Sequence, residues 1–190
     1  MKKVTDIYKG INCNSGKNRL GYIEHFYDSF FKNKDYKTIL EIGCAGGESL
    51  RLWESVFTKA KIFGADIVDR FSPAKATKLI GDAYSIEFIS QFNDGFFELI
   101  IDDGPHTFDS FVSLLKGYYT KLKTGGNLLI EDVIRPFRGR GITEKQQDYL
   151  IQLAEEIGFK NIETYDMTGL GDDHMNNVFR SGVFIIKLEK

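Results

Sequence analysis

Short apolar runs alternate with amphipathic segments along most of this chain, and that alternation constrains its fold more than any other feature. An apolar run of about four to eight residues, bounded by turn residues, is typical of a strand buried on both faces. Such runs occupy residues 37–43, 61–67, 76–83, 97–103, 127–132, 161–165 and 181–188. With helices between them, these runs predict an α/β fold: a doubly wound, mostly parallel seven-stranded sheet with helices on both faces.

Helical periodicity fills several of the segments between these runs. Apolar side chains recur at helical spacing over residues 21–31, 47–57 and 108–122, so we expect amphipathic helices there. A further helix is expected to begin after Thr143, a good N-cap residue, and to end at Gly158. The stretch K-T-G-G at 123–126 predicts a turn before the fifth strand.

Composition limits the class of protein. The chain has 190 residues, 42% of them hydrophobic, so we expect one domain over 1–190 with residues 1–35 as a helical lead-in. The net charge of -2 gives no electrostatic reason to expect nucleic acid as a partner. Because there is no secretory apolar segment and no run of membrane-spanning length, we expect a cytoplasmic protein without a membrane partner. Cys13 and Cys44 are interpreted as reduced thiols.

Carboxylates stand at the end of every strand in the predicted parallel set. These acids are Glu41, Asp66, Asp82, Asp102, Asp103, Glu131 and Asp132. The carboxyl ends of parallel strands meet at one edge of the sheet, which is where ligands bind in such folds. A single acid of this kind is usually a solvated residue or a helix cap, but the joint pattern predicts one site.

The loop at 41–48, E-I-G-C-A-G-G-E, joins a strand to a helix and lets a ligand approach backbone N–H groups. A dinucleotide fingerprint G-x-G-x-x-G fails here, because Ala45 and Glu48 stand at its second and third glycine positions. Glu48 would also repel a pyrophosphate at the start of the helix. Asp66 stands where an acid can accept the hydroxyl hydrogens of a ribose. This spacing alone is compatible with NAD, FAD or S-adenosylmethionine.

Several stretches together resemble class I S-adenosylmethionine-dependent methyltransferases. They are I-L-E-I-G-C-A-G-G-E-S-L-R-L-W, I-F-G-A-D-I, G-D-A-Y, L-I-I-D-D-G-P-H and L-K-T-G-G-N-L-L-I-E-D. The combination of D-D-G-x-H with a later E-D resembles, more narrowly, the metal-dependent sugar O-methyltransferases of the macrocin and mycinamicin type. The segment S-G-K-N-R-L-G-Y-I-E-H-F-Y also looks like the lead-in helix of that group. The resemblance implies a Rossmann-like methyltransferase fold with an antiparallel last strand.

The resemblance also implies roles for individual residues. S-adenosylmethionine would be the cofactor, with its methionine part in the glycine loop, its ribose on Asp66 and its adenine beside Asp82 and Ala83. The implied cofactor-binding residues are Glu41, Gly43, Ala45, Gly46, Gly47, Ser49, Asp66, Asp82, Ala83 and Asp102. The implied metal ligands are Asp103, Glu131 and Asp132, and the implied general base is His106. The chain departs from the group's pattern at Ala45, in place of a glycine, and at Pro105, in place of a small hydroxyl residue.

The chemistry of these residue types agrees with the implied roles. Three carboxylates make an all-oxygen site suited to a hard cation, Mg²⁺ or Mn²⁺. Chelation helps an alcohol to ionise, and a nearby histidine can take its proton. We therefore expect an O-methyltransferase acting on a small-molecule acceptor, a sugar or small polyol. The oligomeric state stays open, and a homo-oligomer is compatible with the sequence.

Other interpretations also remain open from the sequence. The chain could be a non-catalytic S-adenosylmethionine-binding module, or a nicotinamide-dependent oxidoreductase on the same fold class. His106 could only cap the helix that begins near Thr107, and His174 could join Asp172 and Asp173 in a second metal site. An anionic substrate could be bound beside the predicted site by Arg135, Arg138 and Arg140.

Overall fold

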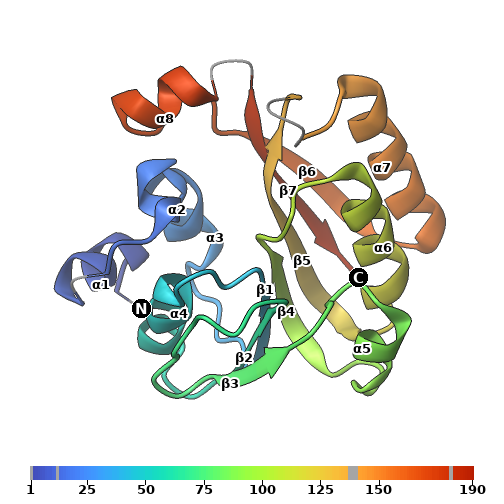
Figure 1. Cartoon of the computed structure of the whole chain (residues 1–190), viewed down its shortest axis with the longest axis horizontal. Coiled ribbons are helices and arrows are strands. Elements are labelled where there is room, and N and C mark those ends of the chain that lie inside the picture. The colour runs from blue at the N-terminus through green and yellow to red at the C-terminus, as the bar shows by residue number, and fades with distance from the viewer. Residues whose placement is uncertain (1, 12, 137–140, 180–181) are drawn as a thin grey trace.

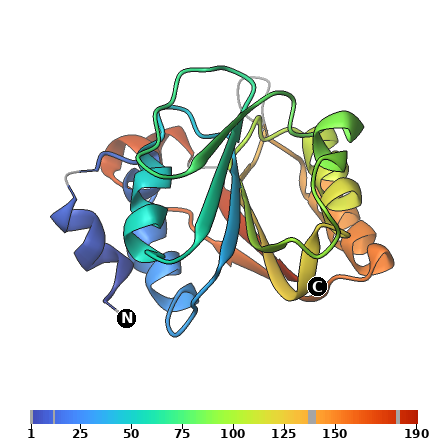
Figure 2. The same cartoon turned by 90° about the horizontal axis from the view of Figure 1, so that it is seen from below.

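The structure, a computed structural model, describes residues 2–11, 13–136, 141–179 and 182–190. A central sheet is covered by helices on both faces, so the molecule has three layers (Figure 1, Figure 2). Two clusters of buried apolar side chains fill the spaces between the sheet and the helices. The doubly wound α/β architecture predicted from the sequence is confirmed.

Seven strands form the sheet in the order β3-β2-β1-β4-β5-β7-β6. They are β1 (Thr38–Ile42), β2 (Lys61–Asp66), β3 (Thr77–Ile80), β4 (Phe97–Asp102), β5 (Leu122–Ile134), β6 (Lys160–Asp166) and β7 (Val183–Glu189). The first five strands pair in parallel, whereas β7 is antiparallel to both of its neighbours, as expected. β1 lies beside β4 although β2 and β3 come between them in the chain, and ligands bind at such a reversal of strand order.

The helices divide between the two sides of the sheet (Figure 1). One side carries α1 (Val4–Gly10), α2 (Gly16–Arg19), the π-helical turn η1 (Ile23–Tyr27), α3 (Asp28–Phe30), α4 (Glu48–Val56) and α8 (Asp173–Val178). The other side carries α5 (Ile86–Ser90), α6 (Phe108–Tyr118) and α7 (Glu144–Ile157). The rings of Tyr27, Phe31 and Trp53 pack against one another between η1 and α4. Burial of these rings anchors the N-terminal segment to the rest of the molecule.

The fifth strand is longer than predicted. β5 begins at Leu122, so the stretch 123–126 lies inside a strand, and the prediction of a turn that precedes the strand was wrong. Its pairing with β4 jumps from Phe97–Leu122 to Leu99–Asn127, and Gly125 has a φ of +76°. The glycines therefore form a bulge within the strand, a feature that a sequence pattern does not distinguish from a turn.

Some boundaries also differ from the prediction. β3 ends at Ile80 rather than at 83, and α6 ends at Tyr118 rather than at 122. The short helices α5 and α8 were not predicted, because five or six residues carry too little periodicity to be recognised. Within the helical lead-in expected over 1–35, α1 and α2 are separate short helices. The limits of α7 are confirmed, with Thr143 as its N-cap and Gly158 in a left-handed conformation at its end.

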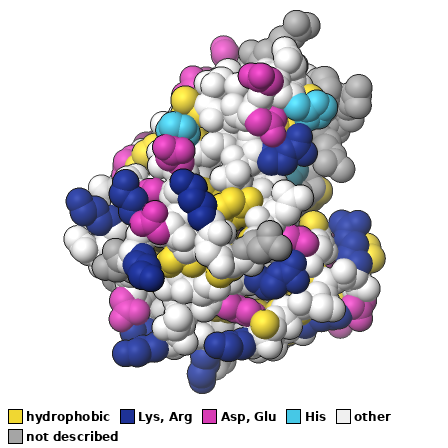
Figure 3. All heavy atoms as spheres, turned by 90° about the vertical axis from the view of Figure 1, so that its left-hand side faces the viewer, with side chains coloured by type: hydrophobic (Ala, Val, Ile, Leu, Met, Phe, Trp, Pro, Cys, Tyr) yellow, Lys and Arg dark blue, Asp and Glu magenta, His cyan; other side chains and the backbone are white. Residues whose placement is uncertain are grey.

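The surface over the N-terminal helices carries charges of both signs. Basic and acidic side chains are interspersed there around a few apolar ones (Figure 3). Within the described ranges, no helix has both the length and the apolar character that crossing a membrane requires.

Candidate active site

The acids at the strand ends meet at one edge of the sheet, as predicted. Glu41 in β1, Asp102 in β4 and Glu131 in β5 belong to three neighbouring strands, and all three are buried. Asp103 directly follows Asp102, and Asp132 directly follows Glu131. The sheet order therefore brings together carboxylates that are up to 91 positions apart in the sequence, counting from 41 to 132.

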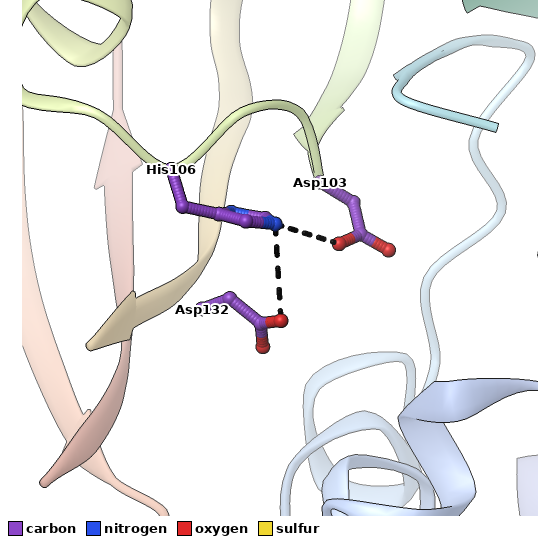
Figure 4. Close-up of side chains that lie close together, drawn as sticks. All are labelled: Asp103, His106 and Asp132. Atoms are coloured by element: carbon purple, nitrogen blue, oxygen red, sulfur yellow. Dashed lines mark ion pairs between the residues drawn. The ribbon is translucent and has the colours of Figure 1, made fainter. Parts of the chain in front are cut away.

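Asp103, His106 and Asp132 form the most compact part of this edge (Figure 4). Nε2 of His106 lies 3.7 Å from Oδ1 of Asp103 and 3.9 Å from Oδ2 of Asp132. One atom from each of the three side chains lies within 4.8 Å of the other two. Nδ1 of His106 is buried and has no hydrogen-bond partner among the described residues. Two carboxylate oxygens and an imidazole nitrogen that converge in this way can hold a divalent cation or exchange a proton.

Unusual backbone geometry aims these side chains. His106 has a φ of +56° and Asp132 a φ of +49°, a left-handed conformation that is uncommon for residues with a side chain. The pairing of β5 with β7 shifts register between Ile130 and Val133, so Glu131 and Asp132 lie in a bulge. Successive side chains of a regular strand point to opposite faces. The bulge is what lets two neighbouring acids face the same site.

The side chain of Lys17, from α2, reaches into the carboxylates and is only 3% exposed. Its ammonium donates to Oδ2 of Asp103 at 2.7 Å and to Oε2 of Glu131, and it lies 3.3 Å from Oε1 of Glu41. Burial alone would lower the pKa of Lys17, but these carboxylates raise it well above its usual value. Burial also raises the pKa of Glu41 and of Glu131, and the ammonium opposes that rise. Lys17 thus ties the ends of β1, β4 and β5 together.

Two tyrosines of the same segment bind further oxygens of the acids. The hydroxyl of Tyr27 donates to Oε1 of Glu131, and the hydroxyl of Tyr22 donates to Oδ1 of Asp132. Tyr22 directly precedes η1, and Tyr27 is its last residue. Hydrogen bonds in a π-helix join residues five apart, which places these two on one side, whereas an α-helix would turn them apart by about 140°. The π turn therefore explains how both hydroxyls reach adjacent acids.

The glycine loop lies against the same edge. Gly43 has a φ of +83°, and a Cβ added there would lie 2.0 Å from the carbonyl oxygen of Asp103. Only glycine lets the loop after β1 approach the residue after β4 so closely. Ala45 adopts a φ of +46°, so the loop keeps a left-handed position where the sequence departs from the usual glycine.

Asp66 and Ser49 hold this loop from its two sides. Oδ2 of Asp66 accepts the backbone N–H groups of Cys44 and Ala45 at 3.0 and 3.1 Å. The hydroxyl of Ser49 donates to Oε2 of Glu41 at 2.8 Å. The acid predicted to hold a ribose therefore also fixes the shape of the glycine loop.

A cavity of about 230 Å³ lies between the glycine loop and the N-terminal segment. Gly43 and Ala45 line one wall, and the acids Asp103, Glu131 and Asp132 line another. Lys17, Leu20 and Tyr22 of the N-terminal segment and Met175 of α8 complete it. The cavity thus joins the loop to the carboxylates.

The remaining predicted cofactor residues lie near the ends of β3 and β4. Asp82 is exposed in the turn after β3, where it accepts the backbone N–H of Tyr84 at 3.0 Å, and Ala83 is buried. Asp102 is fully buried and accepts the hydroxyl of Tyr84. Burial raises the pKa of Asp102 to about 7.

The structure bears on two of the alternative interpretations: His106 as a helix cap, and His174 as part of a second metal site. Thr107, not His106, caps α6, through a reciprocal pair of hydrogen bonds with Ser110. Asp172 caps α8 and pairs with Arg19 at 2.9 Å. His174 is exposed and is not part of the metal-type group found among the described residues.

Arg135 is engaged by neighbouring parts of the fold. Its guanidinium donates to Gln147 at 2.9 Å and lies over the ring of Phe184 at 4.8 Å. Arg138 and Arg140 lie outside the described residues.

Sequence reasoning missed Lys17, Tyr22 and Tyr27. Helical periodicity counts both tyrosines among the apolar side chains of residues 21–31, and nothing in the sequence distinguishes Lys17 within the lead-in over 1–35. One signal was present, because a tyrosine buried on a helix face usually needs a partner for its hydroxyl. The partners themselves depend on the π turn, which the periodicity does not reveal.

Comparison with known proteins gives a consistent picture, although no family model matches the chain. The mycinamicin VI 2''-O-methyltransferase of Micromonospora griseorubida is 31% identical over 123 residues, which cover 59% of this chain and 30% of that protein. The demethylmacrocin O-methyltransferase of Streptomyces fradiae is 28% identical over 123 residues with the same coverage. The chain thus matches about 30% of the length of these relatives.

Solved structures share the fold over most or all of the chain. The MycE methyltransferase from the mycinamycin biosynthetic pathway, in complex with Mg, SAH and mycinamycin VI, has a TM-score of 0.71 at 21% identity. That alignment covers 100% of this chain and 54% of the other. A Methanococcus jannaschii fibrillarin pre-rRNA processing protein has a TM-score of 0.60 at 16% identity, over 82% of this chain and 67% of the other. The predicted resemblance is therefore confirmed: this chain is related in sequence to the macrocin and mycinamicin type of sugar O-methyltransferases and has a methyltransferase fold.

Proposed function

We propose that this chain is an S-adenosylmethionine-dependent O-methyltransferase that acts on a hydroxyl of a sugar or small polyol. It holds a divalent cation, Mg²⁺ or Mn²⁺, at the strand-end carboxylates and uses His106 as general base. The observation that carries the proposal is the cavity that joins the glycine loop to Asp103 and Asp132. The sequence similarity to sugar O-methyltransferases supports the class of acceptor.

The cofactor would lie along the glycine loop and the ends of β2 and β3. Glu41, Gly43, Ala45, Gly46, Gly47 and Ser49 would surround its methionine part, and Asp66 its ribose. Ile67, which follows Asp66, is 70% exposed, and Ile80, the β3 partner of Asp66, is 45% exposed. Exposed apolar side chains beside a strand-end acid suit an adenine ring, which would cover them next to Asp82 and Ala83.

The oxygens around the cavity fit a hard cation. Oδ1 of Asp103 and Oδ2 of Asp132 face one point, with Nε2 of His106 beside them. Both oxygens of Glu131 are bound, one by Tyr27 and one by Lys17. Asp103 and Asp132 would therefore hold the ion first, and Glu131 would join as third ligand once its carboxylate leaves Lys17. When bound, such an ion favours the ionised form of a hydroxyl.

His106 would receive the proton of the acceptor hydroxyl. Its Nε2 lies 3.7 and 3.9 Å from carboxylate oxygens of Asp103 and Asp132, two acids that line the cavity, and these carboxylates would stabilise the imidazolium once the proton arrives. The hydroxyl oxygen would attack the sulfonium methyl as the carbon–sulfur bond breaks, and S-adenosylhomocysteine would leave. Leu20, Tyr22 and Met175 would exclude water from this step.

Calorimetric titration with S-adenosylhomocysteine tests the proposal most directly. We expect binding with a Kd of about a micromolar, measured with Mg²⁺ present and again with a chelator. NADH under the same conditions is the control and should give no heat of binding. Absence of S-adenosylhomocysteine binding would contradict the proposal, and tight NADH binding would favour the oxidoreductase. Binding of S-adenosylhomocysteine without any Mn²⁺ uptake would point to a non-catalytic binding module.

The variant Asp103→Ala tests metal binding separately from cofactor binding. It should weaken Mn²⁺ binding by more than about a hundredfold, because it removes a ligand, and should leave S-adenosylhomocysteine binding largely intact. Asp94→Ala is the matched control, since this exposed carboxylate pairs with Lys121 away from the site. Methyl transfer to a panel of sugars and nucleotide sugars, with and without a chelator, should follow the loss of metal. Full metal-dependent turnover by Asp103→Ala would rule out this metal site.

A further inference from the structure

Lys17 lies at the point where the carboxyl ends of β1, β4 and β5 meet. Its ammonium contacts one acid from each of these ends: Glu41, Asp103 and Glu131. The side chain is almost fully buried, and so are Glu41 and Glu131. Lys17 comes from α2, outside the sheet, so the segment before the first strand supplies the positive charge that these acids lack.

The charges around this point are unequal. Glu41, Asp103, Glu131 and Asp132 carry four formal negative charges, and Lys17 is the positive side chain that the structure places in contact with three of them. Buried carboxylates need a cation or hydrogen-bond donors to remain ionised in the folded state. Tyr22 and Tyr27 supply donors, but they supply no charge.

We propose that Lys17 is a tethered cation that occupies part of the divalent-metal site, so that the protein folds without metal and a divalent cation gains Glu131 as a ligand only by displacing the ammonium from it. This inference rests on the metal site of the proposed function. Oε2 of Glu131 is the oxygen that the ammonium and the metal both require. Asp103 can serve both, because Lys17 binds its Oδ2 while its Oδ1 faces His106.

The consequence is that Lys17 weakens metal binding. A divalent ion at Asp103 and Asp132 is repelled by an ammonium that shares a carboxylate with it. The ion must also release Glu131 from its pairing with Lys17 before that acid can become a ligand. If Lys17 only positioned the acids, its removal would leave the metal ligands misplaced and would weaken metal binding, which is the opposite result.

The test compares the Mn²⁺ affinity of three full-length proteins: wild type, Lys17→Met and Lys17→Arg. Calorimetry measures the affinity directly, and electron paramagnetic resonance of free Mn²⁺ measures it independently. We expect Lys17→Met to bind Mn²⁺ at least about tenfold more tightly than wild type. Lys17→Arg keeps the charge and should stay close to wild type. Lys121→Met is the matched control, because this lysine pairs with Asp94 beside the start of β5 and should leave Mn²⁺ affinity unchanged.

Each possible result with Lys17→Met either supports or overturns the proposed role of Lys17. If Lys17→Met does not fold without metal, Mn²⁺ in the refolding buffer should restore its folding, and failure of that rescue would overturn the proposal. Equal or weaker Mn²⁺ binding by folded Lys17→Met would also overturn it. If neither wild type nor Lys17→Met binds Mn²⁺, this proposal and the proposed metal site both fail. Titration of the same samples with S-adenosylhomocysteine then shows separately whether the cofactor part of the proposed function stands.

Discussion

Tyr27 and Tyr36 are both buried on the same side of the sheet, but their hydroxyls bind groups of different charge. Tyr27 donates to the carboxylate of Glu131, whereas Tyr36 donates to the amide oxygen of Asn127 at 2.6 Å. Hydrogen bonds to charged groups contribute more than bonds between neutral groups, and a buried acceptor left unpaired is costly. The site thus depends on hydroxyls that no strand-end pattern identifies.

Phenylalanine at each position gives a matched pair. We expect Tyr27→Phe to lower the free energy of unfolding by about 1.5–3 kcal/mol and Tyr36→Phe by about 0.5–1.5 kcal/mol. Urea denaturation followed by circular dichroism measures both. Equal losses, or a larger loss for Tyr36→Phe, would show that the bond to Glu131 contributes no more than a neutral one.

At the scale of single residues, the sequence revealed the acids but not their partners. Glu41, Asp103 and Glu131 were predictable because the ends of parallel strands share one edge. Lys17 was not, because its partners lie 24, 86 and 114 positions further along the chain, at 41, 103 and 131. A long side chain reaching across such separations leaves no periodic trace in the sequence.

At the scale of elements, the loop after β1 depends on one glycine. A Cβ at Gly43 would lie 2.0 Å from a backbone carbonyl oxygen, and its φ of +83° is unfavourable for any other residue. Gly95 has a similar φ of +67° but has nothing within 4 Å of an added Cβ. Comparing alanine substitutions at Gly43 and Gly95 therefore separates two costs in stability: that of a left-handed backbone conformation, and that of a steric clash of the added Cβ.

Gly43→Ala should be far more destabilising than Gly95→Ala. We expect Gly95→Ala to lower the free energy of unfolding by about 1–2 kcal/mol, the cost of a left-handed residue. Gly43→Ala should lose more than about 4 kcal/mol, since the loop must also move away from the residue after β4. Urea denaturation measures the difference, and similar losses would mean that the loop yields easily.

The π turn at η1 offers a second test of an element. Deleting His25, which is exposed, would shorten the turn and rotate Tyr22 away from the side occupied by Tyr27. We expect the deletion to lower the free energy of unfolding by at least about 1.5–3 kcal/mol, because one hydroxyl loses its carboxylate. His25→Ala keeps the turn and should stay within about 0.5 kcal/mol of wild type. A deletion variant as stable as His25→Ala would show that the extra residue has no such role.

Prediction of the elements succeeded where the periodicity is long and failed where inserted residues change the geometry. The strands and α7 follow from apolar runs and a cap. Three irregularities add residues to a regular element: the bulge at 123–126, the bulge at Glu131 and the π turn. The sequence pattern predicted none of them. Two of these three irregularities supply residues to the carboxylate cluster, which is consistent with the frequent placement of bulges at functional sites.

At the scale of the whole molecule, the sheet order brings the glycine loop and the carboxylates to one edge, and the N-terminal segment closes over them. A ligand that fills the cavity and touches both would bind the folded chain and not the unfolded one. Such a ligand stabilises the fold by an amount set by its concentration relative to its Kd. Thermal unfolding therefore tests the proposed cofactor pocket independently of any acceptor.

S-adenosylhomocysteine at about a hundred times its Kd should stabilise the chain by about 2.7 kcal/mol. For a chain of 190 residues this corresponds to a rise in Tm of roughly 5–10 °C. NADH at the same concentration should leave the Tm unchanged, because the glycine spacing does not suit a pyrophosphate. Gly95→Ala, remote from the cavity, should show the same rise as wild type from its own lower Tm. A rise in Tm with NADH and none with S-adenosylhomocysteine would reassign the pocket to a dinucleotide. No rise in Tm with either ligand would mean that the loop and the strand-end acids do not form a cofactor site.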